Sequence, residues 1–247
     1  MKMLIVFAAD ECKKLLLQAK IKIIIALSAL SAVAVGLAGI LVGNNTGIQM
    51  VAPGRFPVFV LELMTGFVMP VLAIFIGSEL AGEFKDGSIK NLFALPVPKS
   101  IIYSGKIAAS AAIIGICLLG MGISGTAVSG IINGAEAFGS FGGVVISYLG
   151  AFAFLVMVVI ITSFFTLLTG SPGMAIIMNL FVWFGIGTAS IFLTDIKSYL
   201  PMSFAHWYQP LVNGADPARA LPPVLYMISY GIVFIAAGIM LFDRKEV

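Results

Sequence analysis

The side chains most capable of chemistry in this sequence are concentrated in one interval, from Gly77 to Lys106. It is the longest charged interval between strongly apolar segments, in a chain of which only 10% is charged. Its ionisable side chains are Glu79, Glu83, Lys85, Asp86, Lys90, Lys99 and Lys106. Carboxylates and ammonium groups gathered in this way favour contact with water and with polar surfaces. We therefore interpret the interval as a loop that binds a soluble partner.

Local signals predict a short helix inside this interval. Asp86-Gly87-Ser88 is typical of a turn, and Asp86 or Ser88 is placed to cap the free amides of a helix from Ile89 to about Leu95. Apolar residues at i, i+3 and i+4 give that helix one apolar stripe, formed by Ile89, Leu92 and Phe93. Pro96-Val97-Pro98 ends the helix, because proline lacks an amide hydrogen and restricts the preceding residue. Ser100 is placed to cap the next helix.

Signatures of catalysis are absent from the sequence. A G-x-x-x-x-G-K-[ST] phosphate-binding loop around Lys106 would need glycine at position 100 and Ser or Thr at 107, where the chain has Ser100 and Ile107. Neither G-x-S-x-G nor H-E-x-x-H occurs, and one histidine, His206, leaves little for general-base catalysis. Cys12 and Cys117 form no metal-ligand cluster and are expected to be free thiols. We expect no enzyme, and no cofactor or metal on this chain.

Composition places the chain in a membrane. Hydrophobic residues make up 60% of its 247 residues, the mean hydropathy is +1.12, and several apolar runs exceed the length of about 20 residues that crosses a bilayer. The net charge of +3 does not indicate nucleic-acid binding, because the basic residues flank apolar runs. The lipid bilayer is therefore an expected partner, and nucleic acid is not.

The apolar runs predict one all-α membrane domain over residues 1–247. An amphipathic helix over 1–22 is expected to lie along the membrane surface, with Glu11 and Lys14 on its polar face and Leu15 on its apolar face. Six spans follow, at residues 23–42, 58–76, 101–125, 144–168, 174–193 and 223–242. Residues 77–100 join the second and third spans. Residues 194–222, rich in Trp, Tyr and Pro, are expected as short helices at the outer interface.

Basic residues set the orientation of these spans. Eleven of the 14 Lys and Arg residues fall on the side that holds both termini and residues 77–100, and the other side has Arg55, Lys197 and Arg219. Both termini are therefore expected in the cytoplasm. We expect a polar external turn at Asn44-Asn45-Thr46. At the tight cytoplasmic turn before the fifth span, Ser171 is placed as cap and Pro172 as first helical residue.

Two polar side chains inside the spans are candidates for a substrate path. Glu62 is the one carboxylate within an apolar run, which makes it a functional candidate, although it can also snorkel outward or pair with Arg55. Asn179 in the fifth span either marks a path or bonds to a neighbouring helix. Pro70 is expected to kink the second span.

The order of parts between residues 79 and 106 resembles the coupling-helix region of ABC-2 type transporter permeases, membrane subunits of bacterial exporters of peptides, bacteriocins or drugs. The family pattern reads roughly E, GT, a leucine pair, P-V-S-R and K. Its places are taken here by Glu83, Gly87-Ser88, Leu92-Phe93, Pro96-Val97-Pro98-Lys99 and Lys106. Ser replaces Thr, Pro replaces Ser and Lys replaces Arg. The alternative is an ordinary cytoplasmic loop that is rich in lysine because of topology.

The resemblance implies a specific transport assembly. It has six spans preceded by an interfacial elbow helix, to which Glu11-Cys12-Lys13-Lys14 corresponds, and a re-entrant hairpin before the sixth span. A cytoplasmic coupling helix between the second and third spans inserts into a groove of a separate ATPase subunit. Two copies of that subunit, carrying ATP and Mg, serve a homodimer or a pair of homologous permeases. The coupling residues on this reading are Glu79, Glu83, Gly87, Ser88, Ile89, Lys90, Leu92, Phe93, Pro96 and Lys99.

The substrate is constrained mainly by the scarcity of charge in the spans. Glycine-rich apolar helices favour a hydrophobic or amphipathic substrate such as a peptide, bacteriocin or drug. Export of sodium or lipid is an alternative, and sodium is disfavoured because Glu62 stands alone. Two other classes remain open: a non-transporting membrane protein that anchors or regulates a soluble partner through residues 77–100, and an ion-coupled carrier.

Overall fold

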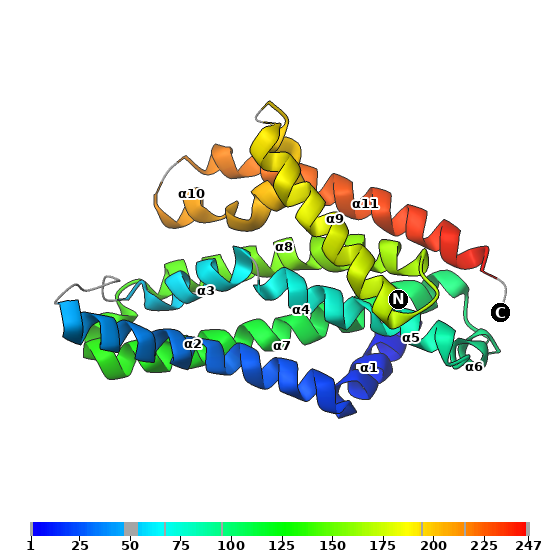
Figure 1. The fold of residues 1–247 in the computed structure, drawn as a ribbon, viewed down its shortest axis with the longest axis horizontal. Coiled ribbons are helices and arrows are strands. Elements are labelled where there is room, and N and C mark those ends of the chain that lie inside the picture. Colours follow the sequence, from blue (N-terminus) through cyan, green and yellow to red (C-terminus); the bar gives the residue numbers. More distant parts are fainter. Residues whose placement is uncertain are drawn as a thin grey trace.

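The computed structural model describes residues 2–46, 54–66, 68–94, 96–193, 195–214 and 216–245. Within these ranges the chain forms helices joined by short turns, with no strand. Five of the helices are long and apolar enough to cross a membrane, and a bent helix pair makes a sixth candidate. Figure 1 shows the long helices running side by side along the longest axis of the molecule. The all-α multi-pass architecture expected from the composition is therefore confirmed.

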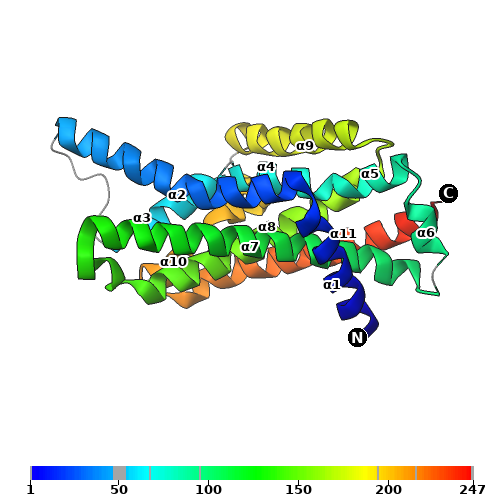
Figure 2. The ribbon, with the colours of Figure 1, turned by 90° about the horizontal axis from the view of Figure 1, so that it is seen from below.

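The chain begins with two helices that meet at a corner. One residue separates helix α1 (Lys2–Leu17) from helix α2 (Ala19–Thr46). Figure 2 shows α1 turned away from the axis of α2 and crossing α7. Helix α2 continues through Asn44-Asn45-Thr46, so the polar turn predicted there is wrong. The residues that follow α2, 47–53, lie outside the described residues.

The segment predicted as the second span is bent near its proline, as expected. It consists of α3 (Phe56–Gly66) and α4 (Val68–Gly77), and α5 (Glu79–Lys85) continues beyond it. The segments Phe56–Gly66 and Pro70–Lys85 are bent by 56° relative to each other. The cause is local, because Pro70 has no amide hydrogen for the carbonyl of Gly66, four residues earlier, and its ring crowds that carbonyl.

Helix α6 (Ile89–Phe93) is shorter than predicted, and α7 (Lys99–Asn133) is much longer, with 35 residues. Neither predicted serine cap forms there. Ser88 precedes α6 but makes no side-chain capping hydrogen bond, and Ser100 lies inside α7, which begins after Pro98. Two more long helices follow the 3-10 turn η1 (Gly134–Phe138): α8 (Phe141–Leu167) and α9 (Pro172–Phe192). The predicted cap of α9 is confirmed, since the Ser171 hydroxyl accepts a hydrogen bond from the Met174 amide at 3.4 Å.

Short helices connect α9 to the last long helix, α11 (Leu221–Asp243). They are η2 (Lys197–Tyr199), η3 (Pro201–His206), α10 (Gln209–Val212) and η4 (Pro217–Ala220). The Trp207 indole donates a hydrogen bond of 2.9 Å to the carbonyl of Gly150. Gly150 lies nine residues into α8, which is about 13 Å along that helix. The segment therefore packs against α8 inside the bundle, and the re-entrant hairpin stays a prediction.

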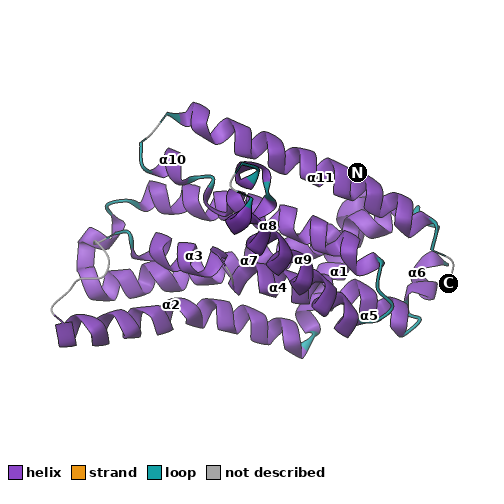
Figure 3. Cartoon of the chain, turned by 45° about the horizontal axis from the view of Figure 1, so that its top comes forward, coloured by secondary structure: helices purple, strands orange, loops and turns teal. Residues whose placement is uncertain are grey.

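Helices α7 and α8 form the centre of the bundle. Figure 3, like Figure 1, places α2 and α11 at opposite edges, with α7 and α8 between them. In the most apolar stretch of each helix, 61% of the residues are buried in α8, but only 17% in α2 and α9 and 11% in α11. Helices α2, α9 and α11 therefore present most of their apolar surface outward.

Candidate functional site

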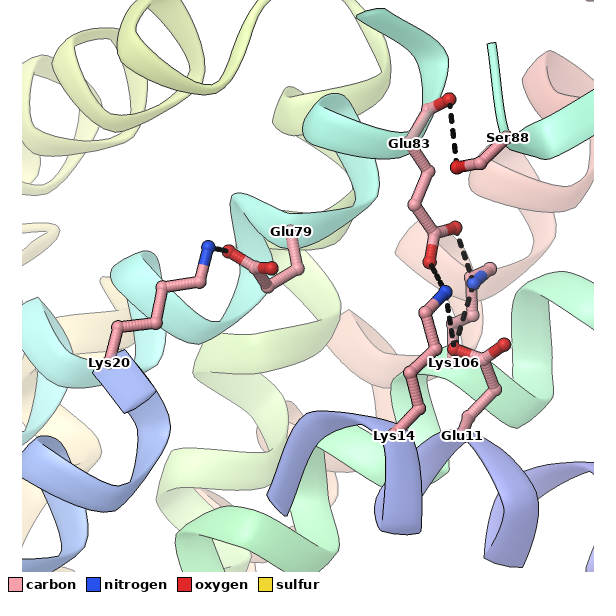
Figure 4. A network of polar contacts seen from close by, with 7 residues as sticks. All are labelled: Glu11, Lys14, Lys20, Glu79, Glu83, Ser88 and Lys106. Atoms are coloured by element: carbon pink, nitrogen blue, oxygen red, sulfur yellow. Dashed lines mark hydrogen bonds and ion pairs between the residues drawn. The ribbon is translucent and has the colours of Figure 1, made fainter. Parts of the chain in front are cut away.

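Four charged side chains meet where α1, α5 and α7 come together, and we call them the ionic cluster: Glu11, Lys14, Glu83 and Lys106 (Figure 4). The Lys106 ammonium lies 3.0 Å from Glu11 Oε2 and 2.5 Å from Glu83 Oε2. Lys14 pairs with Glu83 and lies 3.9 Å from Glu11. Two acids and two bases from three helices thus form one neutral group.

Glycine brings the helices of the ionic cluster close enough to pair. A Cβ added at Gly105, next to Lys106, would lie 2.4 Å from Cδ1 of Phe7. A side chain at position 105 would force Phe7 or the helices to shift, so glycine favours this close crossing of α1 and α7. Phe7, Glu11 and Leu15 follow each other at intervals of four residues and therefore share the face of α1 that meets α7. The prediction that Glu11 lies on the water-facing side of this helix is wrong, because its side chain is buried.

Two members of the ionic cluster are buried, so their pairing matters for the stability of the fold. Lys106 is 8% exposed and Glu11 7% exposed. Charges this deep are tolerated when they are paired, and removing one partner leaves the others uncompensated. A cavity of about 20 Å³ adjoins Glu11, Glu83 and Lys106, which is room for one water molecule that would complete their hydrogen bonding.

Both burial and neighbouring charges change the pKa of Lys14. Burial lowers its pKa, but the hydrogen bond and charge of Glu83, together with the charges of Glu11 and Glu79, outweigh that effect. The pKa of Lys14 therefore lies above its ordinary value. The protonated lysine is the form that the ionic cluster stabilises.

A second ion pair ties α5 to α2. Lys20, at the start of α2, pairs with Glu79, at the start of α5. The Lys20 side chain is 60% exposed, so water screens this pair far more than it screens the pair of Lys106 with Glu11, whose side chains are each 9% exposed. Helix α5 is thus linked by charge to α1, α2 and α7.

The apolar stripe of α6 packs against the protein itself. Ile89 is 0% exposed, and Leu92 and Phe93 are partly buried against the core. The Phe93 ring meets the ring of Phe242 near the end of α11 edge-on, with 5.4 Å between centroids. The core and α11 therefore cover Ile89 fully and Leu92 and Phe93 in part, and contact of this stripe with a partner stays a prediction.

Lys99, the first residue of α7, contacts both α6 and the end of α11. Its ammonium donates hydrogen bonds to the carbonyls of Asp243 at 3.0 Å and Lys245 at 3.2 Å. It also lies 4.6 Å from the centroid of the Phe93 ring, within cation–π range. A position predicted to contact another protein therefore acts within the chain.

Other predicted coupling residues divide between the turn and the open surface. Gly87 has φ of +71°, a conformation that favours glycine, so it sets the turn between α5 and α6. The Ser88 hydroxyl donates to the carbonyl of Glu83 at 3.5 Å. Lys90 and Pro96 are exposed. We define the exposed face of this region as Lys85, Asp86, Lys90, Asn91, Ala94, Pro96 and Pro98.

The two candidate path residues lie in different environments. Glu62 is half-buried and accepts a hydrogen bond of 3.0 Å from Gln209 of α10. Asn179 is 1% exposed and donates to the hydroxyl of Thr166 on α8 at 3.0 Å, which fits the helix-bonding alternative. The predicted pair between Glu62 and Arg55 does not form among the described residues, since Arg55 donates instead to Asn213 at 3.2 Å.

Sequence reasoning missed how the ionic cluster assembles. Lys106 was recognised as part of a family pattern but was given no role, and Glu11 and Lys14 were assigned to an anchor. The signal was present in the four-residue spacing from Phe7 to Glu11 to Leu15, which puts a carboxylate on an otherwise apolar face. Cys12 and Cys117 are free thiols, as predicted.

A family model described as ABC-2 family transporter protein matches residues 9–186. The matched region contains every residue of the ionic cluster and all the helices from α2 to α8. No curated protein matches the chain. Because the family match covers well over half of the sequence, the chain belongs to the ABC-2 family of transporters, as a membrane-embedded transport domain that is not itself catalytic.

Proposed function

We propose that this chain is the permease subunit of an ATP-binding cassette exporter for a hydrophobic or amphipathic substrate such as a peptide, bacteriocin or drug. A separate ATPase, carrying ATP and Mg, binds the exposed face of the α5–α6 region. The observation that carries this proposal is the ionic cluster, in which Glu11 and Lys106 are buried. It joins the segment next to the exposed face directly to α7, the long helix that contacts α1, α2, α3, α8 and α11.

Two routes lead from the exposed face into the membrane-spanning helices. Helix α5 reaches α7 and α1 through Glu83 of the ionic cluster. Helix α6 reaches α11 through the Phe93–Phe242 ring contact. A displacement of the α5–α6 turn by the ATPase would move these helices together, because buried charges and packed rings resist separation.

The exposed face suits a polar docking contact. Its charged members are Lys85, Asp86 and Lys90, and the apolar stripe of α6 stays inside to hold its shape. In this proposal the exposed face and both termini lie in the cytoplasm of a bacterium, where ATP is available. The assembly contains two ATPases and either two copies of this chain or one copy and a homologous permease. The outward apolar surfaces of α2, α9 and α11 leave room for that second permease.

Reconstitution with the ATPase encoded beside this chain tests the proposal. Lys90→Glu on the exposed face is expected to weaken ATPase binding and its stimulation by the permease. Lys197→Glu, an exposed charge in η2 beyond the end of α9 that is remote from α5, is the matched control and is expected to change neither. Equal behaviour of the two variants would contradict docking at the α5–α6 region.

A second variant separates docking from coupling. Phe93→Ala removes the ring that contacts Phe242, and loss of a half-buried aromatic contact costs about 2 kcal/mol. The variant is expected to bind the ATPase and to lose substrate transport. Transport of a labelled amphipathic peptide into inverted vesicles measures this. Full transport by the variant counts against the route through α6 and α11, and a stimulated ATPase without any transported peptide favours another substrate or a regulatory anchor.

A further inference from the structure

A polar cavity opens between α3, α8 and α10, at the end of the molecule away from α6 (Figure 1). Its volume is about 430 Å³. Cavities that bind small molecules in proteins measure about 300–1,000 Å³. This cavity plays no part in the coupling proposed above, and its volume is in the range that binds a small ligand.

Glu62 and Tyr208 both line the cavity. Glu62 lines it with one carboxylate oxygen held by Gln209 at 3.0 Å. Tyr208 also lines it, is 0% exposed, and has a hydroxyl without a hydrogen-bond partner among the described residues. Burial, and to a smaller extent the charge of Glu62, raises the pKa of Tyr208 and keeps the phenol neutral. A buried hydroxyl without a partner is unfavourable, so a ligand that bonds to it gains affinity.

The rim of the cavity carries the opposite charge. The carbonyl of Arg55 accepts the first hydrogen bond of α3, from Phe59 at 2.9 Å, so Arg55 stands at the start of that helix. Its guanidinium is exposed and held by Asn213 at 3.2 Å. Seven residues separate it from Glu62, which is about 10 Å along the helix. The cavity thus has a cationic rim and an anionic group at Glu62.

We propose that this cavity binds a zwitterionic amphiphile of the lysophospholipid type, with its ammonium group at Glu62 and Tyr208 and its phosphate at Arg55. A primary ammonium donates to both the carboxylate and the phenol, whereas guanidinium is suited to phosphate. Val58, Phe59 and Val212 line the same cavity and provide apolar surface for the start of a hydrocarbon chain. A metal ion fits less well, because the described residues include no cluster of three metal-ligating side chains.

Binding to the purified full-length chain, without ATPase or nucleotide, tests the proposal. Three probes with the same hydrocarbon chain are titrated below their micelle concentrations: lysophosphatidylethanolamine, lysophosphatidylglycerol and the alkylammonium ion. The first has both charges, the second lacks the ammonium, and the third lacks the phosphate. The chain has two tryptophans. Trp183→Phe therefore leaves Trp207, next to Tyr208, as the fluorescent reporter.

The ethanolamine probe is expected to bind most tightly. Glu62→Gln should weaken it by at least about tenfold, because a charged hydrogen bond is lost, and should leave the glycerol probe unchanged. Arg55→Gln should weaken both phosphate probes and leave the alkylammonium unchanged. Tyr208→Phe should weaken only the two ammonium probes. Size-exclusion profile and helical circular dichroism establish that each variant is folded.

Equal affinity for the three probes, or an unchanged Kd in folded Glu62→Gln, would overturn the proposal and indicate non-specific partition into the apolar surface. Tighter binding of the alkylammonium than of the ethanolamine probe would also overturn it, since Arg55 would then contribute nothing. The measurement is independent of ATPase docking. A negative result here leaves the exporter proposal standing, and failure of the docking test leaves this site standing.

Discussion

Replacing Lys106 by methionine is expected to destabilise the fold strongly. Methionine keeps an unbranched side chain but removes the charge that pairs with Glu11 at 3.0 Å and with Glu83 at 2.5 Å. The Lys106 and Glu11 side chains are each 9% exposed, so water does little to compensate the two carboxylates. Breaking a buried pair from one side costs about 3–5 kcal/mol. Lys14 still neutralises part of the remaining charge, which places the expected loss near the lower end, about 3 kcal/mol.

Lys20→Met provides the matched comparison. Its partner Glu79 is on the same helix as Glu83, but the Lys20 side chain is 60% exposed, and exposed pairs contribute only about 0–1 kcal/mol. The free energy of unfolding is measured by denaturant titration in mixed micelles, followed by circular dichroism. The double variant Lys106→Met/Glu83→Gln restores neutrality and is expected to recover at least about 1 kcal/mol relative to the sum of the single losses. Equal losses for Lys106→Met and Lys20→Met, or strict additivity in the double variant, would refute this reasoning.

Three further predictions concern close contacts and charge. Gly105→Ala would place Cβ 2.4 Å from Phe7, so it should cost about 1–3 kcal/mol of unfolding free energy, and no loss would show that α1 need not cross α7 this closely. Gly150→Ala would place Cβ 2.6 Å from Tyr208 and push away the segment between α9 and α11, so protease cleavage of that segment should become faster. Unchanged cleavage would argue against close packing of Tyr208 on Gly150. Because the pKa of Lys14 is raised, its pairing stabilises the fold fully below the ordinary value of 10.5 and is lost as pH rises beyond it. Wild-type and Lys14→Met stabilities should therefore converge in that alkaline range, and parallel curves would contradict the pairing.

The long helices could be predicted closely because their signals are local. Apolar runs of about 20 residues locate α8, α9 and α11 to within a few residues, since a bilayer accepts few other structures. The serine cap of α9 and the bend near Pro70 were also predictable, because each follows from the backbone chemistry of one residue.

The surface against which each helix face packs could not be predicted in the same way. The stripe Ile89, Leu92 and Phe93 indicates that one side of α6 is buried, but it does not distinguish a partner's groove from the protein's own α11. Glu11 was misplaced for a related reason. A carboxylate usually marks a water-facing side, and its burial depends on a lysine nearly a hundred residues later in the chain.

Site-specific cross-linking to the ATPase subunit tests the central claim most directly. The chain has two cysteines, Cys12 and Cys117, and their replacement by serine allows a single cysteine to be placed at Lys90, Ile89 or Lys197. We predict cross-links from the exposed position 90, and none from the buried position 89 or from position 197, which lies beyond the end of α9 that is remote from α5. Cross-links from position 197, or none from position 90, would contradict docking of an ATPase on the exposed face of the α5–α6 region.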